Sequence, residues 1–139
     1  MSVVFDTSVL VAFVNPRDPL HKTARSIVER AARGELGKPV TSEHVLVEGL
    51  TLLQRRAGRP EVSRRFASMF TGAKGLPSLV HPVRTGREEL GRAIALHFRH
   101  FAKGLSVTDC VLLVLAEELG APIASFDAGF DGLVGRIAR

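Results

Sequence analysis

Short apolar runs alternate with longer amphipathic stretches along this chain. Apolar runs edged by turn-forming residues are typical of strands buried on both faces of a sheet, and apolar positions recurring every three or four residues are typical of helices. The pattern predicts strands at residues 3–5, 39–42, 78–83 and 121–126, helices at residues 21–33, 42–57, 61–70, 87–101 and 107–119, and a further helix starting near Val9. Because strands alternate with helices, we predict an α/β fold around a mostly parallel sheet.

The predicted helix at residues 107–119 differs from the others because it is apolar on almost every side. Every residue from Cys110 to Ala116 is apolar. A helix without a polar face must be covered on several sides, so we expect it in the middle of the structure, with Cys110 in the core. A single cysteine excludes an internal disulfide and a multi-cysteine zinc site, which suits a reducing cytoplasm.

The bulk composition fits one domain, residues 1–139. The chain is 45% hydrophobic with a mean hydropathy of +0.16, which is enough for one well-buried core. Four clusters that contain Gly or Pro are expected to be loops: NPRDP, GELGKP, GAKGLP and DAGFDG. The longest apolar run is too short to span a bilayer and no signal-peptide pattern precedes Asp6, so we expect a soluble, unprocessed cytoplasmic protein.

Four carboxylates stand in apolar surroundings: Asp6 and Asp127 follow predicted strands, and Glu48 and Asp109 lie on predicted helices. In a parallel sheet, residues that follow strands and those in the first turns of the next helices meet at one crevice. Two such charges about 4 Å apart repel by roughly 4 kcal/mol at an effective dielectric of about 20. A hard divalent cation is the natural counter-charge, so the pattern predicts an all-oxygen metal site.

Each of these acids also has a purely structural interpretation. Asp6 is able to cap the following helix, Asp109 to form a capping box with Ser106, and Asp127 to shape the turn in FDAGF. Glu48 has no Lys or Arg three or four positions away, so a local ion pair does not explain it. We favour the shared site because four separate explanations do not account for four acids at one end of the sheet.

Two serines near these acids are candidates for orienting them. Ser8 lies two residues after Asp6, and Ser125 lies two residues before Asp127. Their hydroxyls are placed to hydrogen-bond carboxylates that hold a metal, although serines more often satisfy backbone groups.

Positive charge is concentrated in the middle of the chain. The segment from Arg55 to Lys103 contains eleven Lys or Arg and three Glu, whereas the whole chain has a net charge of +5. A basic segment beside an acidic site favours a polyanionic substrate. A solvated helical surface is the alternative interpretation.

Other chemistries lack their motifs. The sequence has no dinucleotide-binding or P-loop glycine pattern and no G-x-S-x-G elbow. His97 and His100 lack a third zinc ligand, and we interpret them as helix-surface residues. Phe98 and Phe101 are able to stack on bases, but their helical spacing is more typical of a core.

Three segments together resemble the PIN-domain family, and more narrowly its VapC-like ribonuclease toxins. They are VVFDTSVLVAF, TSEHVLVEGLTLL and LSVTDCVLLVLAEELGAPIASFDAGF. Ser125 stands where Thr is commoner in that family, which keeps the hydroxyl. The resemblance implies a three-layer α/β/α sandwich with a central five-stranded parallel sheet. It also implies Mg²⁺ or Mn²⁺, endonucleolytic cleavage of RNA, a homodimer and a cognate antitoxin.

The resemblance also assigns roles to residues. It implies that the catalytic and metal-binding acids are Asp6, Glu48, Asp109 and Asp127, with Ser8 and Ser125 in support. We expect five arginines to hold the RNA backbone: Arg55, Arg56, Arg59, Arg64 and Arg65. Two alternatives stay open, a housekeeping PIN nuclease that processes RNA without an antitoxin and a catalytically silent RNA-binding module. A phosphorelay receiver is disfavoured, because its paired acids after the first strand and its lysine after the last are absent.

Overall fold

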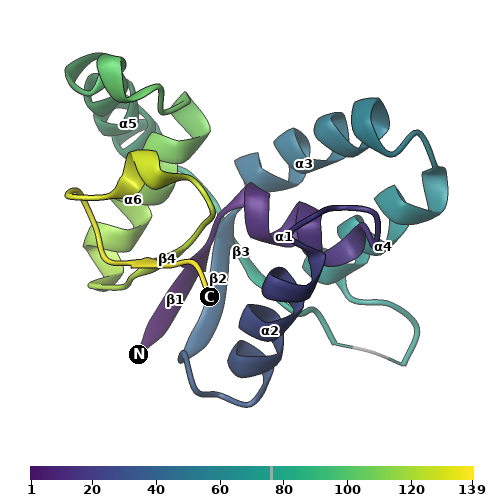
Figure 1. Ribbon diagram of the computed structural model, residues 1–139. Coiled ribbons are helices and arrows are strands. Elements are labelled where there is room, and N and C mark those ends of the chain that lie inside the picture. Colours follow the sequence, from purple (N-terminus) through teal and green to yellow (C-terminus); the bar gives the residue numbers. More distant parts are fainter. Residues whose placement is uncertain (76) are drawn as a thin grey trace.

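Five parallel strands form the centre of the computed structural model, which describes residues 1–75 and 77–139 (Figure 1). The strands are β1 (Ser2–Phe5), β2 (Lys38–Ser42), β3 (His81–Val83), β4 (Ile123–Ala124) and β5 (Arg136–Ile137). The helices are α1 (Thr7–Val14), α2 (His21–Ala32), α3 (Glu43–Arg56), α4 (Pro60–Thr71), α5 (Arg87–Arg99) and α6 (Val107–Leu119). Two short 3-10 helices, η1 (Phe101–Lys103) and η2 (Ala128–Phe130), complete the described elements.

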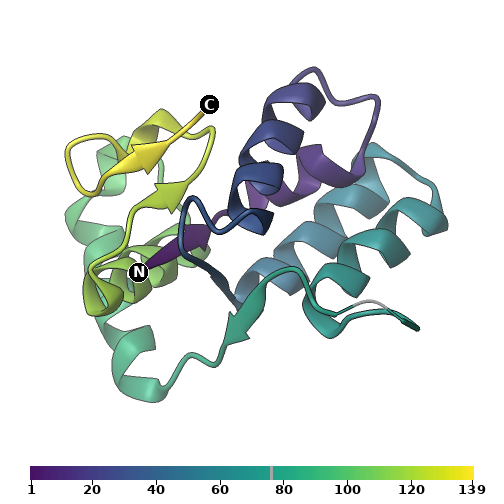
Figure 2. The ribbon, with the colours of Figure 1, turned by 90° about the horizontal axis from the view of Figure 1, so that it is seen from below.

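The sheet order is β3-β2-β1-β4-β5, so the first strand lies at the centre. β1 pairs with β2 through Val4 and Val40 and with β4 through Val4 and Ile123. Helices α1 to α4 cover one face of the sheet, and α5 and α6 cover the other (Figures 1 and 2). This arrangement confirms the predicted three-layer fold. After β3 the chain crosses to the other side of β1 and forms β4, and such a switch in direction opens a crevice at the carboxyl ends of the strands.

The core lies on both sides of β1. Val3, Val4 and Phe5 are almost fully buried, and so is every residue of α6 from Cys110 to Ala116. The prediction that α6 is the central helix and that Cys110 belongs to the core is therefore confirmed.

Several predicted boundaries were wrong. Helix α1 begins at Thr7 rather than near Val9, because Asp6 caps its first turn. The predicted strand at 78–83 is reduced to β3, since the backbone amides of Leu79 and Val80 both donate to the carbonyl of Met69 at the end of α4. The strand at 121–126 is reduced to β4, because the Ala121 amide closes the C-terminus of α6 instead.

Two other features departed from the sequence pattern. The helix expected at 87–101 ends at Arg99 and is followed by η1. Strand β5 was not found from the apolar pattern, because it has only two residues and one of them is Arg136. Leu76, in the GAKGLP loop, lies outside the described residues. Within the described ranges, the helices are all too short or too polar to cross a membrane.

Candidate active site

Asp6 is a buried carboxylate held by hydroxyl groups. It directly follows β1, is 3% exposed and caps α1, its Oδ1 accepting from the Thr7 amide at 2.7 Å. Its Oδ2 accepts from the hydroxyl of Ser8 at 2.8 Å and from that of Ser125 at 2.6 Å. Burial raises the pKa of Asp6 above its ordinary value, although these three hydrogen bonds oppose the rise.

Ser125 connects Asp6 to Asp127. While its hydroxyl donates to Asp6, the same Oγ accepts from the Asp127 amide at 2.9 Å. Ser8 makes a similar link, since its Oγ accepts from the Phe126 amide at 3.1 Å. These contacts tie the chain after β4 to the start of α1. They place Asp127 where its negative charge also raises the pKa of Asp6.

Glu48 enters the same neighbourhood from α3. This helix is capped by Ser42, the last residue of β2, so it starts at the carboxyl edge of the sheet. The hydroxyl of Thr7, the first residue of α1, donates to Glu48 Oε2. Thr7 was not among the predicted site residues, and the only sequence signal for it is the polar DTS run that follows the first strand.

Asp109 stands in the first turn of α6 as half of a capping box. The Ser106 amide donates to Asp109 Oδ2 at 2.8 Å, and the Asp109 amide donates to Ser106 Oγ at 3.1 Å. Burial raises the pKa of Asp109 to about 6, with a further rise from the charge of Asp6 and a smaller one from that of Glu48. Asp109 therefore both caps α6 and lies near the other acids.

The four acids thus share one neighbourhood, and Arg136, whose Nη1 donates to the Ser125 carbonyl at 3.2 Å, lies near enough for the charge of Asp127 to raise its pKa. No ion pair within residues 1–75 and 77–139 includes any of the four. Over the same residues, no three acidic, His or Cys side chains converge closely enough to hold an ion as they stand. Asp109 is turned back onto its capping box, and Asp127 Oδ1 accepts from the Gly129 amide at 2.8 Å. The donor set is all oxygen and fits a hard divalent cation, but ligation requires side-chain rotation.

Comparison with known proteins gives the family. A model of the PIN domain matches residues 3–135. The chain belongs to the PIN-domain family. It is 29% identical over 132 residues to a protein named VapC ribonuclease from Archaeoglobus fulgidus, a match that covers 94% of this chain and 80% of that protein.

Two solved structures have a similar fold. VapC20 of Mycobacterium tuberculosis, described as a toxin that cleaves the sarcin-ricin loop, matches with a TM-score of 0.75 and 26% identity over 92% of each chain. A chain from a toxin-antitoxin complex of Klebsiella pneumoniae matches with a TM-score of 0.66 over 97% of this chain and 95% of that one. At 17% identity, the second match shows the fold alone.

The five predicted RNA-binding arginines of this PIN domain lie where α3 passes into α4. Arg55 and Arg56 end α3, Arg59 precedes α4, and Arg64 and Arg65 lie on α4. Arg59 and Arg64 line a cavity of about 550 Å³ together with Gln54 and Ser63, and four of the arginines are exposed while Arg59 is half-buried. They lie on the same helical pair as Glu48, and in the part of the chain that the structure describes none of them forms an ion pair with the four acids.

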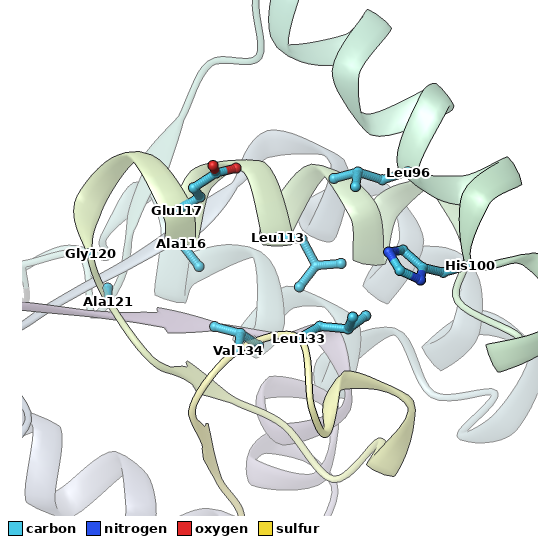
Figure 3. A pocket seen from close by; sticks show the side chains of 9 residues that line it. All are labelled: Leu96, His100, Leu113, Ala116, Glu117, Gly120, Ala121, Leu133 and Val134. Carbon is cyan, nitrogen blue, oxygen red and sulfur yellow. The ribbon is translucent and has the colours of Figure 1, made fainter.

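A separate, mostly apolar cavity of about 450 Å³ lies between α5, α6 and the segment before β5. The side chains of Leu96, Leu113, Leu133 and Val134 point into it, with His100 at one end (Figure 3). None of the four carboxylates lines this cavity, so it is distinct from the acidic site.

Proposed function

We propose that this protein is a metal-dependent endoribonuclease and the toxin of a type II toxin-antitoxin pair. The observation that carries the proposal is Asp6, a buried carboxylate held by Ser8 and Ser125 and accompanied by Asp109 and Asp127. Among the described residues, none of these three acids forms an ion pair with a Lys, Arg or His. Two similar proteins support this proposal: the one from A. fulgidus is named a VapC ribonuclease, and the one from M. tuberculosis is described as a toxin that cleaves the sarcin-ricin loop.

The residues that would hold Mg²⁺ or Mn²⁺ are Asp6, Asp109 and Asp127, with Glu48 completing the shell through water. A bound ion supplies a more acidic water for attack and neutralises charge that develops on the phosphate. Because burial and mutual repulsion raise the pKa of Asp6 and of Asp109, a cation at this place favours the ionised forms of both.

The chain's own residues set the geometry of this site. Ser8 and Ser125 fix the position of Asp6 Oδ2, and Thr7 fixes Glu48. We assign to Glu48 the orientation of the attacking water. Arg55, Arg56, Arg59, Arg64 and Arg65 hold the RNA backbone through phosphate contacts, which fix register but do not read sequence.

The proposal includes the partners expected of such a toxin. We infer a cognate antitoxin that covers the acidic crevice, assembly as a homodimer, and action in the cytoplasm on cellular RNA. A short antitoxin reading frame next to the gene separates this function from a housekeeping RNA-processing nuclease. Light scattering of the purified protein tests the dimer.

One experiment tests metal, activity and target together. Purified protein is incubated with mixed cellular RNA in Mn²⁺, in EDTA, and as the Asp109→Asn variant, and new RNA ends are mapped. We expect discrete new ends only for the unaltered protein in Mn²⁺. Circular dichroism checks that the variant is folded. Binding of RNA without cleavage under all conditions overturns the nuclease and identifies a silent RNA-binding module.

A further inference from the structure

Two phenylalanines on α5 and η1 face solvent instead of the core. Phe98 is 68% exposed and Phe101 is 64% exposed, which contradicts the sequence-based expectation of core packing. Their rings are almost parallel, with an interplanar angle of 4° and centroids 6.4 Å apart. Large exposed aromatic side chains held in one orientation mark an interaction surface.

His97 fixes this aromatic pair. Its ring packs edge-on against Phe98 at 5.2 Å and against Phe101 at 5.4 Å between centroids. Its Nδ1 donates to the Leu105 carbonyl at 2.8 Å. The three rings therefore form one unit that is anchored to the segment just before α6.

That segment leads directly into the acidic site. Leu105 is followed by Ser106, which forms the capping box with Asp109. On the other side, η1 packs against η2: a Cβ added to Gly129 would lie 3.2 Å from the Lys103 carbonyl oxygen and 3.0 Å from Asp127 Oδ1. The aromatic pair is thus connected through short packed segments to two of the four carboxylates.

The charge around the pair is positive. Arg99 directly follows Phe98, Lys103 lies two residues after Phe101, and both are exposed. The sequence from Leu90 to Thr108 contains no Asp or Glu, and the Glu117 of α6 that shares a hollow with Arg99 is paired with Arg92. Lys103 Nζ donates to the Asp131 carbonyl at 3.0 Å, and the Asp131 carboxylate, whose pKa Lys103 helps to lower, is already paired with Arg136. In a two-fold contact between copies of this chain, the same patch meets itself, and these cations would face one another. A polyanion with flat apolar groups complements the surface better than a second copy does.

Resting on the ribonuclease function proposed above, we propose that Phe98 and Phe101 form a stacking platform for unpaired bases of the RNA. Arg99 and Lys103 contact the phosphates on either side of the stacked bases. Aromatic stacking tolerates any base and requires the base to be unpaired, so the platform selects single-stranded RNA over duplex near the acidic site.

The test measures binding of a short mixed-sequence single-stranded RNA that contains the fluorescent base 2-aminopurine. The Asp6→Asn background keeps the RNA intact, and Phe98 and Phe101 are changed together to Ala, to Leu or to Tyr. Leu119→Ala, which trims another exposed apolar side chain at the far end of α6, is the matched control. We expect the Ala and Leu pairs to weaken binding roughly 5- to 100-fold and to abolish quenching of the 2-aminopurine, whereas the Tyr pair and Leu119→Ala retain both. The same RNA annealed to its complement should bind all variants alike.

Three results overturn the platform. The first is an unchanged RNA affinity of the Ala pair. The second is a Leu pair that keeps both the affinity and the quenching of 2-aminopurine. The third is a lower molecular mass of the Ala pair in solution, which would assign the surface to contact with a second copy of the chain. If the unaltered protein cuts RNA while the Ala pair binds as before, only the platform is wrong. If the unaltered protein neither cuts nor binds RNA, the proposed function falls and the platform with it.

Discussion

The hydroxyl of Ser125 donates to Asp6 Oδ2 at 2.6 Å, although the two residues are 119 positions apart in the sequence. This bond joins the end of the central strand to the chain that follows its neighbour β4. It is also one of three hydrogen bonds that stabilise the charged form of the buried Asp6.

Replacement of Ser125 by Ala is expected to destabilise the protein and to lower cleavage. The substitution removes a donor from buried Asp6 and the acceptor of the Asp127 amide, and a buried group left unsatisfied costs about 1–3 kcal/mol. Thermal unfolding and RNA cleavage measure the two effects. Ser125→Thr keeps the hydroxyl and should restore both; equal loss in the Thr variant would show that the site depends on side-chain size and not on the hydrogen bonds.

Divalent metal is expected to stabilise the protein through the acidic site. An ion that binds only the folded state adds about 2.7 kcal/mol at a hundred-fold excess over its Kd. Calorimetric melting in Mn²⁺ and in EDTA should therefore differ for the unaltered protein and agree for Asp6→Asn. Equal melting temperatures of the unaltered protein in both conditions would contradict a metal site here.

The sequence predicted that the four acids lie near one another because two of them, Asp6 and Asp127, follow apolar runs that are easy to recognise. The strand before Asp6 and the all-apolar helix after Asp109 are both visible as patterns of a few residues. Thr7 was missed because its partner Glu48 is 41 positions away, and no local pattern reports a side-chain bond of that range.

Errors in the fold have equally specific causes. β5 holds two residues including Arg136, and its place in the sheet comes from pairing with β4 rather than from its own apolar content. Phe98 and Phe101 were assigned to the core because helical spacing identifies a shared face, but it does not show whether another layer covers that face. Helix α5 belongs to the outer part of its layer, and this face is left uncovered by the described residues.

Metal-free protein is expected to lose stability as the pH rises from about 4 to about 6. The pKa of Asp109 is raised to about 6 in the folded state, so over this range the folded state holds a proton that the unfolded state has released. The proton bound to Asp109 stabilises the folded state at about pH 4, and this stabilisation is lost as the pH approaches 6. Chemical denaturation in EDTA across this range should show a smaller pH dependence for Asp109→Asn than for the unaltered protein, and identical dependences would refute the raised pKa.

Two glycine substitutions should have opposite effects on stability. A Cβ at Gly49 of α3 would clash with the ring of buried Phe66 on α4, so Gly49→Ala is expected to cost roughly 1–3 kcal/mol or more. A Cβ at Gly91 of α5 meets no described atom within 4 Å, so Gly91→Ala should stabilise the helix by about 0.5–1 kcal/mol. Urea unfolding of both variants measures the difference, and a neutral Gly49→Ala would show that the α3–α4 contact is looser than described.

Neutralising the arginines between α3 and α4 should weaken binding of every RNA by a similar factor, whatever its sequence. In Arg55→Gln/Arg56→Gln, each lost phosphate contact reduces the slope of log affinity against log salt by about 0.7 for single-stranded RNA. Titrations at several salt concentrations measure this slope. Arg33→Gln, which removes an exposed arginine already paired with Glu35, is the control and should leave the slope unchanged. A slope equally reduced in the control would assign the effect to net charge alone.

The capping box of α6 gives the protein an internal reporter. Asp109 Oδ2 accepts from the Ser106 amide, so a rotation of this carboxylate toward a bound ion would break that hydrogen bond. Such a rotation would free the amide proton of Ser106. Its solvent exchange and its NMR shift would then report occupancy of the crevice without any label on the RNA.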